Sequence, residues 1–83
     1  MRLLQERRNE IIRIAAQHGA LNIRVFGSIY FLINYDLEKI TPWFPAGLLM
    51  DLQDLLGYRV YIVTEKGLSP LIKDRILESA KPL

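Results

Sequence analysis

The 83-residue sequence contains no cysteine and a single histidine, His18. Because there are no thiols, a disulfide framework, a cysteine-ligated metal centre and a cysteine nucleophile are all excluded. One imidazole also argues against a histidine-based zinc site or a Ser-His-Asp triad. These two shortages remove the thiol-based and imidazole-based classes of enzyme and metalloprotein.

The chain carries only a small excess of positive charge. Eleven Lys and Arg residues face nine Asp and Glu residues, so the net charge is +2 and the pI is about 9.2. This falls short of the basic stripe of a dedicated nucleic-acid binder, and a nucleic-acid partner is not expected. No apolar run approaches the ~20 residues that cross a bilayer, and charge begins at Arg2, too early for a signal peptide. We therefore expect a cytoplasmic protein without membrane contact.

Length and composition predict one globular domain over residues 1–83. Hydrophobic residues make up 51% of the chain and charged residues 24%, which argues against a disordered polypeptide. A chain of this length normally forms a single domain. Because a core of this size supplies only a few kcal/mol, the apolar richness suggests burial against a partner.

Hydrophobic periodicity predicts a first helix over residues 2–18, followed by two strands. Apolar residues at positions 4, 11, 12 and 15 recur at helical spacing, and His18-Gly19 supplies an end to the helix. Two β-prone runs, 21–26 and 29–33, are separated only by Gly27 and Ser28. Such a link predicts a tight hairpin with Gly27 at positive φ.

Residues 34–44 show no consistent period, and residues 41–45 read as a loop. A helix, a strand and a final helix are predicted after them. Pro45 suits the first residue of a helix, and Gly57 suits its end. Between them a leucine stripe at positions 48, 49, 52, 55 and 56 marks the apolar face of this second helix. Residues 59–64 read as a third strand, and Ser69-Pro70 suits the start of the last helix. The apolar face of that last helix consists of Ile72, Ile76 and Ala80, with Leu77 beside them.

The element order is therefore α-β-β-α-β-α. It predicts an α/β fold (α+β on stricter definitions), with a small three-stranded mixed sheet and helices packed on at least one face. The β-α-β portion demands a right-handed crossover, so we expect the second and third strands to be parallel.

Two segments resemble a known family. They are residues 24–28, RVFGS, and residues 51–70, DLQDLLGYRVYIVTEKGLSP, with the resemblance continuing through 76–83, ILESAKPL. Together they resemble the minimal nucleotidyltransferases, small members of the DNA polymerase β-type superfamily that often act as antitoxins beside HEPN-domain ribonucleases. The resemblance covers nearly the whole chain and implies a nucleotidyltransferase-like fold.

The resemblance also implies a mechanism for active members of the family. The Gly-Ser pair after the first strand, here Gly27 and Ser28, contacts nucleotide phosphates. An Asp-x-Asp pair on the second strand and a third acid on the last strand hold Mg²⁺. The metal is needed because a triphosphate and an attacking hydroxyl repel each other, and Mg²⁺ on carboxylate oxygens neutralises the developing charge.

This sequence departs from that pattern at each acidic position. The segment between Gly27-Ser28 and the acidic strand, which carries the first Asp in relatives, is absent. Tyr30 stands where the second Asp would fall, and Tyr61 stands at the position of the third. A phenol with a pKa near 10 is a poor ligand for Mg²⁺. The comparison predicts no catalytic residues, no metal site and no cofactor in this chain, whereas active relatives use Mg²⁺ and ATP.

Several residues have two interpretations. Gly27 and Ser28 can bind phosphate through backbone donors or can simply form a hairpin turn. Asp36 and Glu38 are interpreted as solvated loop carboxylates, although they are the only acids near the expected metal position. The remaining polar residues are interpreted as solvated groups or, for His18, as a helix-end cation: Asp51, Asp54, His18, Arg2, Arg7, Arg8 and Arg13.

Four aromatic residues are candidates for a protein interface: Tyr30, Tyr61, Trp43 and Phe44. Tyr30 and Tyr61 can instead pack against each other across adjacent strands. Trp43 and Phe44 lie between two prolines and can equally cover the end of the core.

The resulting hypotheses belong to two functional classes. The first is a binding module that grips a HEPN-type ribonuclease toxin, or a second copy of the chain, through apolar surface. The alternative is a Mg²⁺-dependent enzyme that transfers AMP from ATP to a protein tyrosine, with Asp36 and Glu38 as the metal ligands. A small RNA-binding protein is a third and weaker option.

Overall fold

The computed structural model describes residues 2–27 and 30–83. Its elements follow one another in this order: α1 (Arg2–Glu6), α2 (Arg8–Gln17), β1 (Ala20–Phe26), β2 (Tyr30–Tyr35), α3 (Ala46–Leu56), β3 (Tyr61–Thr64), the short 3₁₀ helix η1 (Glu65–Gly67), α4 (Pro70–Ser79) and β4 (Lys81–Pro82). Within these residues, no helix has the length and apolar character needed to cross a membrane.

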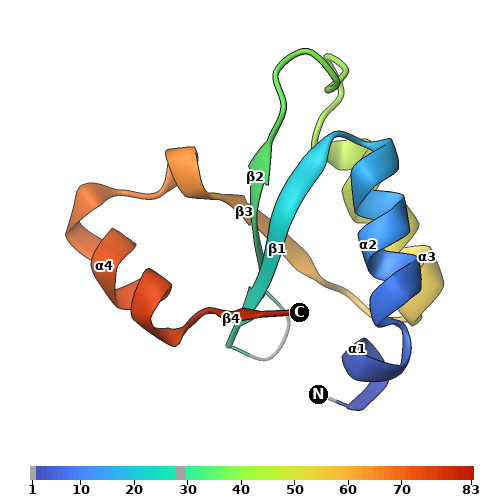
Figure 1. Ribbon diagram of the computed structural model, residues 1–83, viewed down its shortest axis with the longest axis horizontal. Coiled ribbons are helices and arrows are strands. Elements are labelled where there is room, and N and C mark those ends of the chain that lie inside the picture. The colour runs from blue at the N-terminus through green and yellow to red at the C-terminus, as the bar shows by residue number, and fades with distance from the viewer. Residues whose placement is uncertain (1, 28–29) are drawn as a thin grey trace.

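The strands form one mixed sheet in the order β3-β2-β1-β4 (Figure 1). β1 is antiparallel to β2 and to β4, and β2 is parallel to β3, with α3 in the connection between them. The α+β fold class and the parallel pair are confirmed. The expected count of three strands is wrong, because Lys81 and Pro82 add a two-residue strand beside β1. So short a strand leaves no periodic pattern in the sequence.

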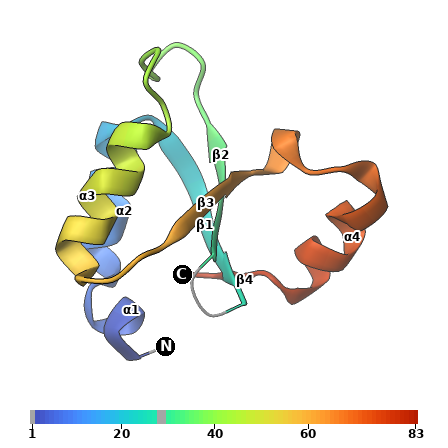
Figure 2. The same cartoon turned by 180° about the vertical axis from the view of Figure 1, so that it is seen from behind.

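One face of the sheet is covered by α2 and α3, which lie together on the same side in both views (Figures 1 and 2). Burial by these helices follows the apolar periodicity of each element. The fully buried centre of the molecule consists of Phe31, Ile33 and Leu32 of β2, Ile11 of α2, Leu48 and Leu52 of α3, and Val60. The predicted leucine stripe of the second helix is therefore confirmed as core.

The opposite face, called here the outer face, is organised differently. Side chains alternate along a strand, so Tyr30, Leu32 and Asn34 of β2 point to this side while Phe31 and Ile33 point to the core. α4 lies on the outer side (Figures 1 and 2), but none of its residues is buried.

The apolar face expected on the last helix is only partly covered. Ile72 is exposed, Ile76 is only half-buried, and Ala80 lies beyond the last helical residue as the C-cap.

The single helix expected over residues 2–18 is two helices in the structure, α1 and α2. A turn at Arg7, with φ −102° and ψ 11°, separates α1 from α2. Neither proline nor glycine marks this break in the sequence. Leu4 of α1 and Ile11 of α2 are still both buried, so each piece contributes to the core as the periodicity predicted.

The predicted β1–β2 hairpin is confirmed by the antiparallel pairing of Phe26 with Tyr30. Ile29, the expected first residue of the second strand, lies outside the described residues. Gly27 has φ +60°, which confirms the predicted positive φ; Ser28 lies outside the described residues. Further along β1, Asn22 has φ +52° at an irregularity in the register between Leu21 and Arg24. Asparagine tolerates this left-handed conformation better than most residues and fits a β-bulge.

Two glycines end helices as predicted. Gly19 follows the C-cap of α2 with φ +80°, and Gly57 caps α3 with φ +76°. Their surroundings differ. A Cβ on Gly19 would lie 3.0 Å from Cβ of Lys39 and 3.1 Å from its carbonyl carbon, whereas a Cβ on Gly57 would meet nothing within 4 Å.

These two glycines give a matched test of the fold. Gly57→Ala should lower the free energy of unfolding by about 1 kcal/mol, the cost of placing an L-residue in the left-handed region. Gly19→Ala should cost about 2–4 kcal/mol, because it adds a clash with Lys39 to the same backbone cost. Urea denaturation of both variants measures the difference. Equal losses would contradict the packing of Lys39 against Gly19.

Candidate functional site

The candidate site lies where β1 ends and β2 and β3 begin, beside Gly27. The parallel register pairs Tyr30 of β2 with Tyr61 of β3, and the antiparallel register pairs Tyr30 with Phe26. Tyr30 and Tyr61, the two residues that the sequence comparison assigned to acidic positions, are therefore direct neighbours in the sheet.

Three aromatic rings occupy this end of the outer face. The ring centroids of Phe26 and Tyr30 are 5.1 Å apart, and those of Tyr30 and Tyr61 are also 5.1 Å apart, with interplanar angles of 23° and 21°. Stacked rings at this separation stabilise a sheet beyond the area that they bury. Tyr30 nevertheless remains 39% exposed and Tyr61 42% exposed. The pair thus combines cross-strand packing with a large accessible surface.

The carboxylates of the chain lie elsewhere. Asp36 follows β2 at the end opposite Tyr30, where its Oδ1 accepts a hydrogen bond from the backbone N–H of Glu38 at 3.0 Å. Within residues 2–27 and 30–83, no three Asp, Glu or His side chains form a group that could hold a metal ion.

His18 and Asp51 depart from the sequence interpretation. His18 Nε2 lies 2.7 Å from Asp51 Oδ2 and so joins the end of α2 to α3. Asp51 was expected to be a solvated carboxylate and His18 an isolated helix-end cation. The two helices pack side by side on the sheet, and this brings the side chains into contact.

The basic residues of the first helical segment also have specific partners. Arg7 pairs with Glu10 at 3.0 Å, and Nε of Arg8 donates to the backbone oxygen of Leu83 at 3.1 Å. The Arg8 contact ties α2 to the residue after β4. Arg8 is exposed, as a solvated helix face requires, and it also makes this specific contact.

A polar cluster of four residues occupies the rest of the outer face. Arg24 donates to Glu65 Oε1 at 2.9 Å and to Asn34 Oδ1 at 2.8 Å, and Asn34 donates to Glu65 Oε2 at 3.1 Å. Asn22 completes the cluster by donating to Asn34 Oδ1 at 3.0 Å. The Arg24 side chain is only 12% exposed. Such a shielded guanidinium needs these partners, since an unpaired charge there would be costly.

This cluster was not predicted from the sequence. The predicted second strand ended at residue 33, but β2 continues to Tyr35 and carries Asn34 into the sheet. A usable signal was present, because Asn22, Arg24 and Asn34 interrupt otherwise β-prone apolar runs. Polar residues inside such runs indicate a sheet face that is not simply packed against apolar side chains.

The cluster also changes the ionisation of one carboxyl group. The hydrogen bond from Arg24, followed by that from Asn34, lowers the pKa of Glu65 below its ordinary value of 4.5. These bonds favour the charged form of the carboxylate over the neutral form. Glu65 is therefore held as an anion by its partners on β1 and β2.

Trp43 and Phe44 have different surroundings, although they are adjacent in the sequence. Phe44 packs partly buried against the core, with its ring centroid 5.4 Å from that of Tyr35. Trp43 is 77% exposed. Both belong to the segment after β2, at the opposite end of that strand from Tyr30. The four aromatic interface candidates therefore do not form one surface.

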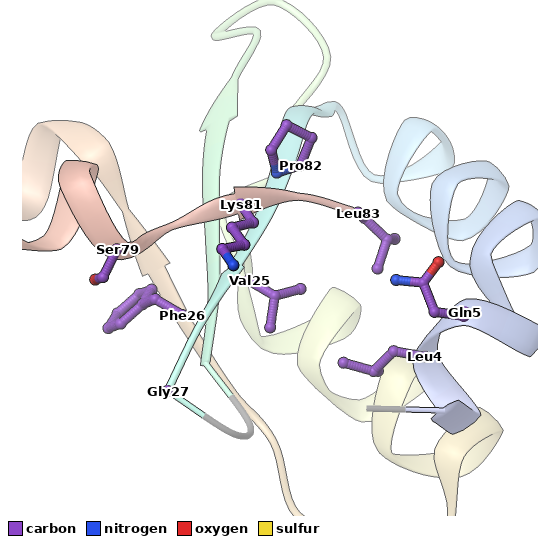
Figure 3. A pocket seen from close by; sticks show the side chains of 9 residues that line it. All are labelled: Leu4, Gln5, Val25, Phe26, Gly27, Ser79, Lys81, Pro82 and Leu83. Carbon is purple, nitrogen blue, oxygen red and sulfur yellow. The ribbon is translucent and has the colours of Figure 1, made fainter.

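A pocket of about 350 Å³ opens beside the Gly27 turn (Figure 3). It lies between the end of β1, the β4 segment and α1. Its lining includes Gln5 of α1, Phe26 and Gly27 at the end of β1, and Lys81 of β4.

The Glu65 contacts predict a pH-dependent contribution to stability. Because the folded pKa is lowered, the stabilising effect of the charged carboxylate should be complete above the unfolded pKa of about 4.5 and be lost as pH falls through the folded value. Wild type should therefore be more stable than Glu65→Gln at neutral pH, and the gap should close in acid. Urea midpoints measured across this pH range test the prediction.

Arg24→Met provides the control background for that experiment. Without the guanidinium, Glu65→Gln should change stability by much less at neutral pH. A gap between wild type and Glu65→Gln that did not vary with pH would contradict the assigned role of the cluster.

Comparison with known proteins places these features in a family. No family model matches the chain, and no curated protein matches it either. A solved structure described as a minimal nucleotidyltransferase is similar, with a TM-score of 0.83 and 36% sequence identity over 96% of this chain and 92% of that chain. Similarity in sequence and fold over nearly the full length of both chains identifies this chain as a member of the minimal nucleotidyltransferase family.

Proposed function

We propose that this chain keeps the nucleotidyltransferase fold but acts as a binding module rather than as a metal-dependent transferase. The observation that supports this most directly is the Tyr30–Tyr61 stack. The two residues are register partners at the start of β2 and β3, where the family pattern calls for acids, and their rings are 5.1 Å apart.

The electrostatic argument concerns the oxygens that Mg²⁺ requires. Hard divalent cations are bound by carboxylate and phosphate oxygens, whereas a phenol with a pKa near 10 is neutral at physiological pH. Glu65, at the other end of β3, already accepts hydrogen bonds from Arg24 and Asn34. Without carboxylates beside Gly27, nothing offsets the repulsion between a triphosphate and an incoming hydroxyl.

The proposed binding surface is the aromatic part of the outer face. Partly exposed tyrosines are frequent anchors of protein interfaces, because each combines a large apolar ring with a polar tip. The partner that we propose is a HEPN-type ribonuclease, as in the antitoxin members of the family.

The first test concerns nucleotide binding. Isothermal titration of the chain with Mg-ATP should give no saturable heat, because the stacked tyrosines cannot hold the metal. Saturable binding accompanied by transfer of labelled AMP to a protein tyrosine would instead support the alternative function, a Mg²⁺-dependent transferase.

A restored variant serves as the positive control for that titration. Inserting the family's loop after Ser28 together with Tyr30→Asp and Tyr61→Asp should recover metal-dependent nucleotide binding. Failure to recover it would mean that the assignment of these two positions to the acidic sites is wrong.

The second test concerns the partner. The chain should co-elute with a HEPN-type ribonuclease on size exclusion, and the double variant Tyr30→Ser, Tyr61→Ser should weaken the complex by at least about tenfold, as expected for interface anchors. Trp43→Ser, at the far end of β2, is the matched variant and should leave the affinity unchanged. Circular dichroism checks that both variants remain folded. A chain that stays monomeric and does not bind the ribonuclease would refute the proposed function.

A further inference from the structure

The sheet has an uncovered edge at β3. This strand is the last in the order β3-β2-β1-β4, so among the described residues only its β2 side has a neighbouring strand. In Figure 2 β3 lies in front of β2 and β1, and no other segment is drawn across it. The molecule is 18 Å thick along its shortest axis, the direction of that view, which is close to the width of four strands at about 4.8 Å each.

The backbone donors on this edge belong to Ile62 and Thr64. The N–H of Val60, just before β3, donates to Oε1 of Gln53 in α3 at 3.3 Å rather than to β2. Successive N–H groups of a strand point to opposite edges, so Ile62 and Thr64 direct theirs to the same side as Val60. Thr64 is still extended, with φ −89° and ψ 142°. A further strand could therefore accept hydrogen bonds from both residues.

The segment 59–65, RVYIVTE, is complementary to itself when two copies run antiparallel with Ile62 opposite Ile62. The other opposed pairs in this register are Arg59 with Glu65, Val60 with Thr64, and Tyr61 with Val63. Opposite charges are a favourable cross-strand pair, and so is an aromatic ring beside a β-branched side chain. A register centred on Val63 would instead place Tyr61 opposite Glu65 and separate the two opposite charges.

The faces of the two sheets also match in this register. Tyr61 and Val63 are the register partners of Tyr30 and Leu32 on β2 and therefore point to the outer face. Residues that lie opposite each other in an antiparallel pair point to the same face. A two-fold axis perpendicular to the sheet thus joins the outer faces of two copies on one side and their core faces on the other.

The charged pair is available on both sides. Arg59 is exposed, and within the described residues its side chain makes no hydrogen bond or ion pair. Glu65 accepts one hydrogen bond on each carboxylate oxygen, from Arg24 and Asn34, and its side chain remains 28% exposed. Each carboxylate oxygen can accept a second hydrogen bond. A guanidinium without a partner in its own chain would therefore find a carboxylate in a second copy.

We propose that two copies of this chain associate through their β3 edges, antiparallel and with Ile62 opposite Ile62, so that their sheets become continuous. The N–H of Ile62 in each copy donates to the Ile62 carbonyl of the other, and Arg59 of each pairs with Glu65 of the other. This pairing uses the one β3 edge of each copy, so it closes at a dimer. It goes beyond the proposed function and does not depend on it.

Sedimentation equilibrium over a concentration series is the first test. The chain should show a monomer–dimer equilibrium with a Kd on the order of 100 µM, because an interface between two short strands is small. A chain that remains monomeric well above this concentration would overturn the proposal.

Matched arginine variants test the charged pair. Arg59→Glu places two like charges opposite each other at each end of the strand pair and should weaken the dimer at least about tenfold. Arg13→Glu, on an exposed residue of α2 outside the segment 59–65, changes the net charge equally and should leave the dimer unchanged. Circular dichroism checks that both variants remain folded. Equal weakening by the two variants would contradict the Arg59–Glu65 contact and the register built on it.

Single cysteines test the register directly, because the chain has none of its own. Ile62→Cys should form a disulfide-linked dimer under mild oxidation, since the Cα atoms of a hydrogen-bonded antiparallel pair are about 5.5 Å apart. In Thr64→Cys the two cysteines would be more than about 13 Å apart and should not cross-link. Cross-linking no more efficient at residue 62 than at residue 64 would overturn the proposal.

All three experiments use the chain alone. The dimer can therefore fail to form whether or not the chain binds a HEPN-type ribonuclease, and ribonuclease binding can fail whether or not the dimer forms.

Discussion

The structure depends on the complete burial of three successive residues in the middle of β2, Phe31, Leu32 and Ile33. Side chains alternate between the two faces of a strand, so three buried neighbours require cover on both sides of the sheet. α2 and α3 provide that cover for Phe31 and Ile33. On the other side, Leu32 has Arg24 and Val63 as its register partners on the neighbouring strands. The polar cluster is therefore part of how a small sheet closes its second face without packing a helix tightly against it.

Much of this architecture could be predicted because local signals agreed with the global fold. The glycines at positions 19 and 57, the Ser69-Pro70 start and the leucine stripe of α3 each have a local physical cause that the fold preserves. The errors have a different origin. Asn34 and the β4 segment take their structure from pairing with distant strands, and α4 lacks the burial that its apolar residues suggested. None of these features can be inferred from a single helical or strand period.

The candidate site likewise contains features that the sequence predicts and features that depend on distant segments. The juxtaposition of Tyr30 and Tyr61 could be predicted, because it follows from a parallel β-α-β connection and a family resemblance. The bonds joining Arg24, Asn34 and Glu65 could not, since they join residues up to 41 positions apart in the sequence. The pocket between Gln5 and Lys81 likewise arises only when the first and last elements are brought beside β1. Contacts between chain segments so far apart require the tertiary structure.

The composition of β4 has a consequence for how copies of this protein meet in concentrated solution. A free strand edge can recruit another strand and start fibril growth, and natural sheets often block that edge with lysine or proline. β4 consists of Lys81 and Pro82. Pro82 has no backbone N–H to offer an incoming strand, and Lys81 adds charge repulsion between like copies. The β4 edge of the sheet is therefore a poor template for amyloid-like growth.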